Sequence, residues 1–186
     1  MPRKRLRGLA PSTMPAVMLD PAFVADCPYG PGGLLIDDIV RVDRDASTVV
    51  ASMATSDELP LTRDQRAHPE RHPRHVAGGL MIHATGMLGF AHAYFVLDLR
   101  HADGWVGYGT QIHEARFRKM ARIGPPMLLT CTATSIRKIR GAIVGRYAFR
   151  FEQEGDVVYT GDQTAMFHRN RNPTWTAGNT ETALGL

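Results

Sequence analysis

The sequence contains only two cysteines, Cys27 and Cys131, among its 186 residues. Two cysteines are too few for the disulfide framework of a small secreted domain, so we expect the protein to work in a reducing cytoplasm. Long apolar runs are also missing, because glycine, histidine or a charged residue interrupts every candidate, and this argues against a transmembrane helix. The basic residues 1–7 are followed by no apolar segment of the kind that a secretory signal needs.

Motifs for organic cofactors and for nucleic acids are absent as well. No glycine-rich dinucleotide fingerprint follows a predicted strand and no phosphate-binding loop is present, so we expect no cofactor. Zinc-finger spacing, aromatic RNA-binding motifs and basic heptad helices are missing, which argues against a nucleic-acid partner. The remaining composition, with 44% hydrophobic and 22% charged residues, is ordinary for a single globular domain with tails.

The charge balance of the chain is mildly basic. A formal net charge of +4 at pH 7 favours an anionic partner without identifying one. The phosphates of coenzyme A and the acidic surface of a carrier protein both fit this charge. Arg116, Arg118 and Lys119 gather on one predicted strand and are the candidates for binding such a carrier, although a solvated surface explains any one of them equally well. Arg3, Arg5 and Arg7 form a second basic group at the start of the chain.

The chain divides into three parts. We expect a basic, proline-containing extension over residues 1–28 without regular structure, a folded domain over 29–168 and a polar tail over 169–186. Within the domain, the pattern predicts strands at 34–43 and 48–55, followed by a polar loop at 56–77. A loop of that length inside a compact domain is often functional.

Residues 79–97 are the one segment with convincing helical periodicity, and four predicted strands follow it. These strands occupy 105–119, 127–136, 142–151 and 156–167, and the short links between the last three favour antiparallel neighbours. One long helix with about six antiparallel strands predicts an α+β fold in which a curved sheet wraps around the helix. The apolar positions of the helix are Leu80, Ala84, Met87, Leu88, Ala91 and Phe95.

Histidines are concentrated just before and within the predicted helix. His68, His72 and His75 lie in the polar loop, and His83 lies at the edge of the apolar stripe of the helix. A partly buried imidazole that titrates near neutral pH can act as a general acid or base. A hydrogen-bonded core histidine is the alternative reading of His83. We expect no metal site, because loop histidines are commonly solvated and neither cysteine is near in sequence.

Gly78 and Gly79 open the predicted helix. The N–H groups of the first helical turn have no partner within the helix, and together with the helix dipole they can stabilise a developing oxyanion. Glycine also lets a substrate carbonyl approach the backbone closely. A tight turn into the helix is the alternative explanation for the two glycines.

Three segments in this order resemble the hotdog-fold hydroxyacyl-thioester dehydratases of fatty-acid synthesis. Residues 68–83 are similar to the family's His-Phe-Pro-Gly loop and to the start of its central helix. Residues 112–126 resemble a later strand of the family with its Ala-Arg-Phe-Lys-Arg motif, and residues 155–167 resemble its last strand. The resemblance covers roughly residues 28–168.

This resemblance implies an antiparallel sheet wrapped around the central helix, assembled as a homodimer with two active sites at the interface. In the family, a loop histidine removes the α-proton of a 3-hydroxyacyl thioester, a helix carboxylate handles the hydroxyl, and backbone N–H groups at the helix start polarise the carbonyl. Carried over, His68 matches the loop histidine with His72 as its competitor, and Gly78 and Gly79 match the backbone donors. His83 occupies the position of the helix carboxylate.

We therefore expect a dehydratase-type enzyme that acts on an acyl thioester of coenzyme A or of an acyl carrier protein. A hotdog thioesterase that uses Gly78 and Gly79 as its oxyanion hole is the first alternative. A non-catalytic protein that binds acyl thioesters is the second. The missing helix carboxylate weakens both enzymatic readings, although an imidazole can also donate or accept a proton.

Overall fold

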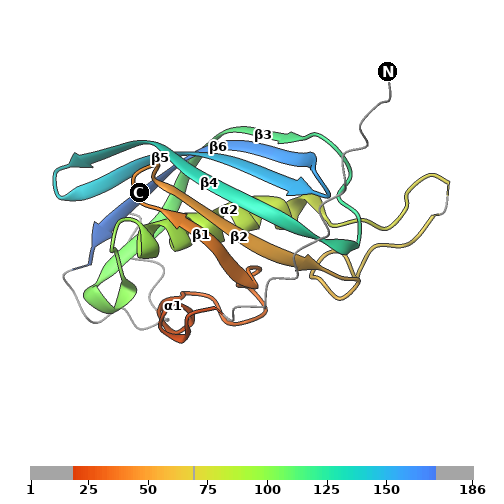
Figure 1. Ribbon diagram of the computed structural model, residues 1–186, viewed down its shortest axis with the longest axis horizontal. Helices are drawn as coiled ribbons and strands as arrows, with labels where there is room; N and C mark the ends of the chain where they lie inside the picture. Colours follow the sequence, from red (N-terminus) through yellow and green to blue (C-terminus); the bar gives the residue numbers. More distant parts are fainter. Residues whose placement is uncertain (1–18, 69, 171–186) are drawn as a thin grey trace, which may run out of the picture.

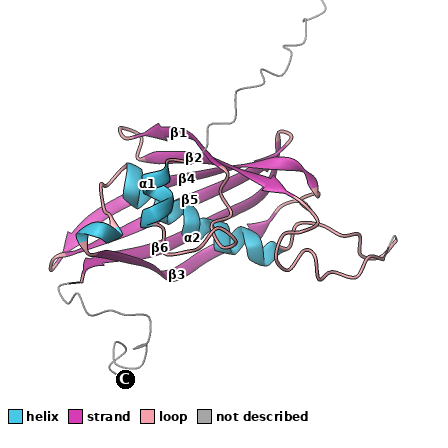
Figure 2. Ribbon diagram, turned by 90° about the horizontal axis from the view of Figure 1, so that it is seen from below, coloured by secondary structure: helices cyan, strands magenta, loops and turns pink. Residues whose placement is uncertain are grey.

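A computed structural model describes residues 19–68 and 70–170 of the chain (Figure 1). One antiparallel sheet of six strands forms one layer, and helix α2 (Gly78–Phe95) lies across one of its faces (Figures 1 and 2). The predicted α+β layout is confirmed. The strands are β1 (Asp38–Asp43), β2 (Thr48–Thr55), β3 (Trp105–Phe117), β4 (Gly124–Ile139), β5 (Ala142–Gln153) and β6 (Asp156–Arg169), in the order β1-β2-β4-β5-β6-β3.

Strands β4, β5 and β6 form a continuous meander because two tight turns join them. The turn residues Arg140–Gly141 and Glu154–Gly155 all have positive φ, which is the conformation that two-residue hairpin turns need. Strand β5 alternates as predicted, with Arg146 and Arg150 exposed on the outer face. Its inner face is buried through Tyr147, Phe149 and Phe151.

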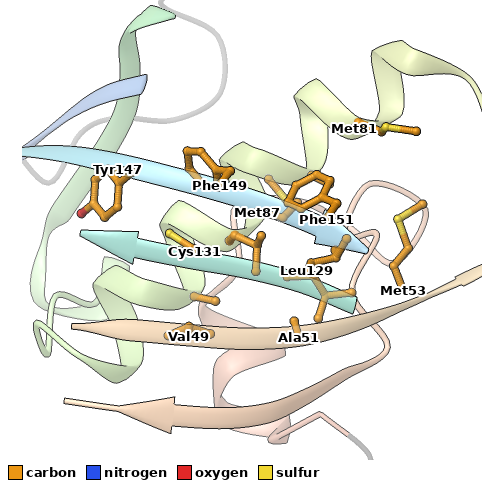
Figure 3. Packing of buried hydrophobic residues seen from close by; sticks show 14 of the residues in the cluster. Val49, Ala51, Met53, Met81, Met87, Leu129, Cys131, Tyr147, Phe149 and Phe151 are labelled. Atoms are coloured by element: carbon orange, nitrogen blue, oxygen red, sulfur yellow. The ribbon is translucent and has the colours of Figure 1, made fainter. Parts of the chain in front are cut away.

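Helix α2 is apolar on nearly all sides, because the sheet curves around it and buries most of its surface. The helix begins one residue before the predicted start and ends two residues before the predicted end. Its predicted apolar positions are buried except Phe95, which is half-buried. Across from it, the sheet contributes Val49, Ala51, Leu129 and Phe151 to the core (Figure 3).

The first predicted strand is shorter than expected. Strand β1 begins at Asp38, whereas the sequence predicted a strand over residues 34–43. The reason lies in Asp37, whose backbone N–H donates to the carbonyl of Ser52 while its carboxylate accepts the N–H of Ala54. The carboxylate of Asp37 thus accepts the N–H of Ala54, which a longer β1 would use to pair with β2. The pairing of the two strands therefore stops at this point.

The N-terminal extension contains a helix that the sequence analysis missed. Asp20 is the N-cap of helix α1 (Pro21–Asp26), and its carboxylate accepts the N–H of Ala22 over 2.9 Å. An Asp-Pro pair at the N-cap and first helical position is a recognised start signal. Phe23 is fully buried and stacks on Phe90 of α2 with 5.0 Å between ring centroids, which fixes α1 on α2.

Arg3, Arg5 and Arg7 lie outside the described residues, and so does the predicted tail beyond residue 170. A short 3-10 turn, η1 (His101–Asp103), leads from α2 into β3. Among the described residues, no helix has both the length and the apolar character needed to cross a membrane.

Candidate active site

The start of helix α2 presents two backbone donors. The N–H of the preceding Ala77 donates to the hydroxyl of buried Thr62 over 3.1 Å, and Leu80 N–H donates to Ala77 O over 3.0 Å. Gly78 and Gly79 stand between these anchored residues in the first turn, where the helix itself offers no acceptor. Neither N–H group has an acceptor outside the helix among residues 19–68 and 70–170, so both can donate to a bound oxygen.

Two apolar side chains flank these glycines. A Cβ on Gly78 would lie 2.8 Å from the ring of Phe117, and a Cβ on Gly79 would lie 3.1 Å from Leu61. Phe117 and Leu61 are both about half exposed. The helix start is thus a narrow, apolar entrance that stays open because neither glycine carries a side chain.

His83 lies one turn further along α2 and has a defined tautomer. Its Nε2 lies 2.7 Å from the backbone carbonyl oxygen of Gly33, and its ring meets Tyr29 edge to face at 5.1 Å. A carbonyl can only accept, so Nε2 carries the hydrogen and Nδ1 of the neutral ring keeps its lone pair. The half-buried imidazole can therefore accept a proton at Nδ1.

The donors and the imidazole share one face of the helix. Gly79, His83, Gly86 and Phe90 follow each other at intervals of three or four residues, which places them in one line along α2. Gly79 and Gly86 are exposed, and His83 and Phe90 are half-buried. The segment before β1 packs on this line, because Phe23 stacks on Phe90 and the ring of Tyr29 meets His83.

A cavity of about 230 Å³ continues from this line between α2 and strands β3, β5 and β6. The space exists because glycines replace larger side chains: at Gly86, Gly89 and Gly109 an added Cβ would meet nothing within 4 Å. Most of the wall is apolar or aromatic, and the size is below the about 300–1,000 Å³ of common small-molecule sites. The wall includes Tyr29, Phe90, Trp105, Tyr108, Phe149, Ala165 and Phe167.

The two loop histidines are not brought to His83 within the described chain. His68 and His72 pair with each other through two backbone hydrogen bonds of 3.0 Å, and both are exposed. Nδ1 of His68 accepts the N–H of Arg71 over 3.0 Å. The loop that carries them extends beyond the N-terminal end of α2 (Figure 1). Their proposed roles in proton transfer stay predictions.

The third loop histidine does not complete a metal site in the described part of the chain. His75 lies 5.1 Å from His72 between ring centroids, and its Nδ1 lies 3.0 Å from the carbonyl oxygen of Pro73. No group of three metal-ligating side chains converges anywhere in residues 19–68 and 70–170.

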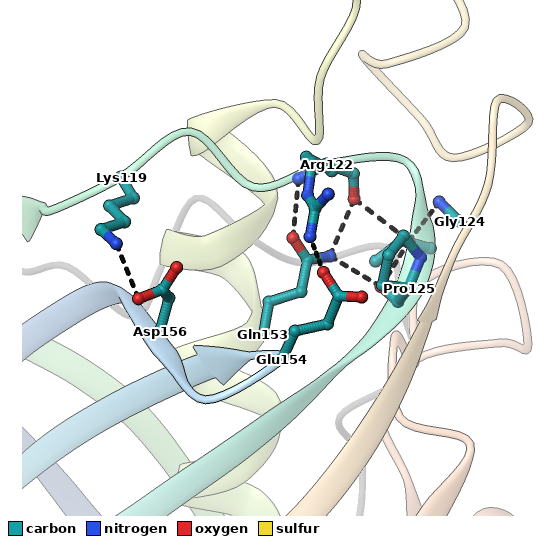
Figure 4. Close-up of polar contacts among 8 residues, drawn as sticks. Lys119, Arg122, Gly124, Pro125, Gln153, Glu154 and Asp156 are labelled. Atoms are coloured by element: carbon teal, nitrogen blue, oxygen red, sulfur yellow. Dashed lines mark hydrogen bonds and ion pairs between the residues drawn. The ribbon is translucent and has the colours of Figure 1, made fainter.

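The predicted carrier-binding residues lie at the end of β3, next to Phe117 in the sequence. Successive side chains of a strand point to opposite faces, so Arg116 does not share the face on which Phe117 meets Gly78. Arg116 pairs with Glu114, and Lys119 pairs with Asp156 over 2.6 Å (Figure 4). Arg118 makes only a long contact of 3.5 Å to the hydroxyl of Thr160. Exposed ion pairs contribute about 0–1 kcal/mol, so these cations can exchange their partners for a phosphate at little cost.

Gln153 holds the link between β3 and β4, which contacts the chain just before α2. The sequence did not predict this role. Its side chain is buried, accepts the N–H of Arg122 over 2.8 Å and donates to the carbonyls of Arg122 and Pro125 over 2.8 and 2.6 Å (Figure 4). These bonds hold the link between β3 and β4, where Ala121 O accepts the N–H of Val76 over 2.9 Å. A glutamine at an inward position of alternating β5 was the signal available in the sequence.

His92, further along α2, is a core histidine. It is fully buried, and its Nε2 lies 3.1 Å from the carbonyl oxygen of Ser47. Burial lowers the pKa of His92 to about 4. The two helix histidines therefore differ: His92 is fully buried, whereas His83 is half-buried and contacts the segment before β1.

No protein-family model matches the sequence, and no curated protein matches it. Solved structures do resemble the fold. A variant of a thioesterase from Pseudomonas aeruginosa aligns with 18% identity and a TM-score of 0.53, over 80% of this chain and 92% of its own. A thioesterase from Haemophilus influenzae aligns with 16% identity and a TM-score of 0.52, over 81% and 91%.

A dehydratase is also among the similar structures. The dehydratase heterocomplex ApeI:P from Xenorhabdus doucetiae aligns with 15% identity and a TM-score of 0.55, over 81% of this chain and 90% of that chain. At these identities the likeness concerns the fold. The chain has the hotdog fold, as the resemblance in its sequence implied.

Proposed function

We propose that this protein is a thioesterase that hydrolyses a short acyl thioester. The observation that carries the proposal is the line along α2, where the free N–H groups of Gly78 and Gly79, the Nδ1 of His83 and the cavity follow one another. Hydrolysis needs one oxyanion site and one base acting on water, and this line offers both. The thioesterases among the similar structures support this reading over the dehydratase that the sequence favoured.

In the proposed reaction, the thioester carbonyl oxygen accepts hydrogen bonds from the N–H groups of Gly78 and Gly79. Nδ1 of His83 removes a proton from water, and the resulting hydroxide adds to the carbonyl carbon. The tetrahedral oxyanion stays bound to the two donors, and the Gly33 carbonyl on Nε2 stabilises the imidazolium. When the C–S bond breaks, the leaving sulfur takes the proton from His83, which yields a thiol and a carboxylic acid.

Dehydration of a 3-hydroxyacyl thioester is the second candidate. It is favoured by the position of His83, where the resembled dehydratases carry their helix carboxylate, and by the dehydratase among the similar structures. This reaction needs a second group to protonate the departing hydroxyl. His68 or His72 would have to supply that group, and neither contacts His83 in the described chain.

The proposal extends to the carrier of the acyl group. Arg116, Arg118 and Lys119 would hold the phosphate of coenzyme A or of a carrier-protein arm at the entrance near Phe117. Replacing Arg118 by glutamine should raise KM for an acyl-CoA and leave KM for the matching acyl-pantetheine unchanged, because pantetheine lacks the phosphates. Equal KM changes for both substrates would remove Arg118 from carrier binding.

A homodimer is part of the same proposal. Strand β3 pairs with β6 on one side only, and Tyr108, Ile112 and Phe117 on it are about half exposed. Such an edge is a template for strand pairing with a second chain. Light scattering after size-exclusion chromatography should give twice the chain mass of 20.5 kDa. A monomeric mass would overturn the dimer.

Mass spectrometry of a thioester panel decides between the reactions. Saturated acyl-CoA substrates of increasing length and their 3-hydroxy forms would be incubated with the protein. We expect free acid and thiol from the short saturated substrates. Loss of water from the hydroxy substrates without hydrolysis would favour dehydration, and an unchanged panel would favour binding alone. If dehydration is found, His68→Ala and His72→Ala identify the second proton-transfer group.

A further inference from the structure

The cavity beside α2 is lined by a buried phenol. Only 1% of the surface of Tyr147 is exposed, yet its hydroxyl has no hydrogen-bond partner among the described residues. Buried hydroxyls are normally paired, because an unpaired one loses its hydrogen bonds to water without replacement. An unpaired donor in a cavity wall is a position that a ligand atom can fill.

The surroundings of Tyr147 keep this hydroxyl free and protonated. The ring meets His92 edge to face at 5.1 Å, and no hydrogen bond joins the two side chains (Tyr147 is labelled in Figure 3). A Cβ on Gly145 would lie 2.7 Å from the hydroxyl oxygen, so the missing side chain gives the phenol its room. Burial raises the pKa of Tyr147, and the group therefore remains an O–H donor at neutral pH.

Gln163 adds a second polar position to the same wall. It lies directly opposite Tyr147 in the ladder of β5 and β6, lines the cavity, and its Nε2 has no partner. Its Oε1 lies 3.0 Å from the hydroxyl of Thr85, which lies 2.6 Å from the carbonyl of Ile82. Thr85 has one hydrogen to give and can pair with only one end of the amide, and the Gln163 side chain also interacts with the hydroxyl of Tyr159.

A plain alkyl chain is a poor occupant of such a wall. It would fill the apolar space, but it would leave the hydroxyl of Tyr147 without a hydrogen bond. An acyl group with an oxygen at this depth would pair with the phenol and still use the aromatic wall. The helix residues that line the cavity run from Thr85 to Ala93, about 12 Å at 1.5 Å per residue, which suits a short chain.

We propose that the cavity selects an acyl group that carries a hydroxyl or carbonyl oxygen, and that Tyr147 is the residue that determines this specificity. The inference rests on the proposed function only for the way in which the thioester end of the ligand is bound. The pairing of Tyr147 with the acyl oxygen does not depend on turnover, so binding tests it separately.

The test uses pantetheine thioethers, which cannot be hydrolysed and which carry the arm that coenzyme A and carrier proteins share. S-hexyl-pantetheine is compared with its 4-oxo, 5-oxo and 6-hydroxy forms by calorimetry. We expect at least one oxygen-bearing form to bind about tenfold more tightly than the hexyl compound, the effect of one good hydrogen bond. Equal or weaker binding of all three oxygen-bearing forms would overturn the proposal.

Tyr147→Phe removes the hydroxyl and keeps the ring. This variant should lose the preference while binding S-hexyl-pantetheine as the unmodified protein does. Tyr94→Phe is the control, because Tyr94 is also a buried tyrosine and does not line the cavity. A preference that survives Tyr147→Phe, or that Tyr94→Phe abolishes equally, would remove the role of Tyr147.

Thioester turnover separates this inference from the proposed function. Hydrolysis of hexanoyl and 5-oxohexanoyl pantetheine at equal kcat/KM, together with equal thioether binding, would leave the thioesterase and overturn the specificity. Selective thioether binding without any hydrolysis would keep the specificity and overturn the thioesterase.

Discussion

His83 donates a hydrogen bond from Nε2 to the backbone carbonyl of Gly33 over 2.7 Å. This bond ties α2 to the segment that leads into β1, and it leaves Nδ1 as the acceptor on the ring. The carbonyl thereby orients the imidazole.

Replacing His83 by glutamine should lower the rate of thioester hydrolysis about a hundredfold or more, the contribution of a general base. The glutamine amide can still donate to Gly33 O, so we expect an unchanged melting temperature. The measurement is thiol release followed with a thiol-reactive dye. His113→Gln, at an exposed histidine of β3 hydrogen-bonded to Thr164, is the control and should keep full activity. An active His83→Gln enzyme would exclude this base.

Gly79→Ala should separate stability from activity. Alanine favours the helix by about 0.5–1 kcal/mol over glycine, so thermal stability should stay equal or rise. Its Cβ would lie 3.1 Å from Leu61 and narrow the entrance over the N–H group, so kcat/KM should fall at least about tenfold. Gly32→Ala, where a Cβ meets nothing within 4 Å, is the control. Full activity of Gly79→Ala would argue against a carbonyl bound here.

Gly89→Leu should shorten the acyl pocket. Gly89 is buried and lines the cavity, and a Cβ there has no neighbour within 4 Å. The leucine would occupy the space of the chain end, so hydrolysis of hexanoyl thioesters should fall while that of acetyl thioesters remains. Steady-state kinetics with both substrates provides its own control. A parallel loss for both chain lengths would place the acyl group elsewhere.

His92 should make stability depend on pH in the acid range. The folded state keeps the buried ring neutral down to a pKa of about 4, whereas the unfolded chain binds a proton at the ordinary histidine pKa of about 6.5. The free energy of unfolding should therefore fall as the pH drops from 6.5 to 4, by up to about 1.4 kcal/mol per pH unit from this residue. Above pH 6.5 this contribution is complete.

Urea unfolding at a series of pH values measures this dependence. His92→Gln retains a donor for Ser47 O without titrating, so its slope between pH 4 and 6.5 should be shallower than that of the unmodified protein. Identical slopes in the two proteins would mean that His92 does not resist protonation in the folded state.

Gln153→Leu should destabilise the fold by about 1–3 kcal/mol, because it removes the acceptor of the Arg122 N–H and leaves the carbonyl of Arg122 with only the hydroxyl of Thr55 as a donor. The link between β3 and β4 also holds Val76 near the helix start, so activity should fall as well. Gln111→Leu, on exposed β3, is the matched control and should change stability by no more than about 0.5 kcal/mol. Equal unfolding midpoints for both variants would contradict the role of Gln153.

The spacing of apolar residues was sufficient to predict a helix or a strand wherever one face of that element packs on the core. The alternation of β5 predicted which of its side chains are buried, and the periodicity of α2 predicted the central helix. The placement of Gly78, Gly79 and His83 on one helix could be predicted from the sequence, because their spacing sets their relative positions. The Asp-Pro start of α1 was a local signal as well, and it was overlooked.

The sequence by itself determined the α+β class, the central helix and the order of the strands along the chain, because the period of apolar residues reports which face is buried. Tertiary structure decided the rest. It placed β3 beside β6 at the edge of the sheet, kept His68 and His72 apart from His83, and set Tyr147 opposite Gln163 beside an empty space. These relations depend on strand register and on packing between distant segments, and no local pattern encodes either.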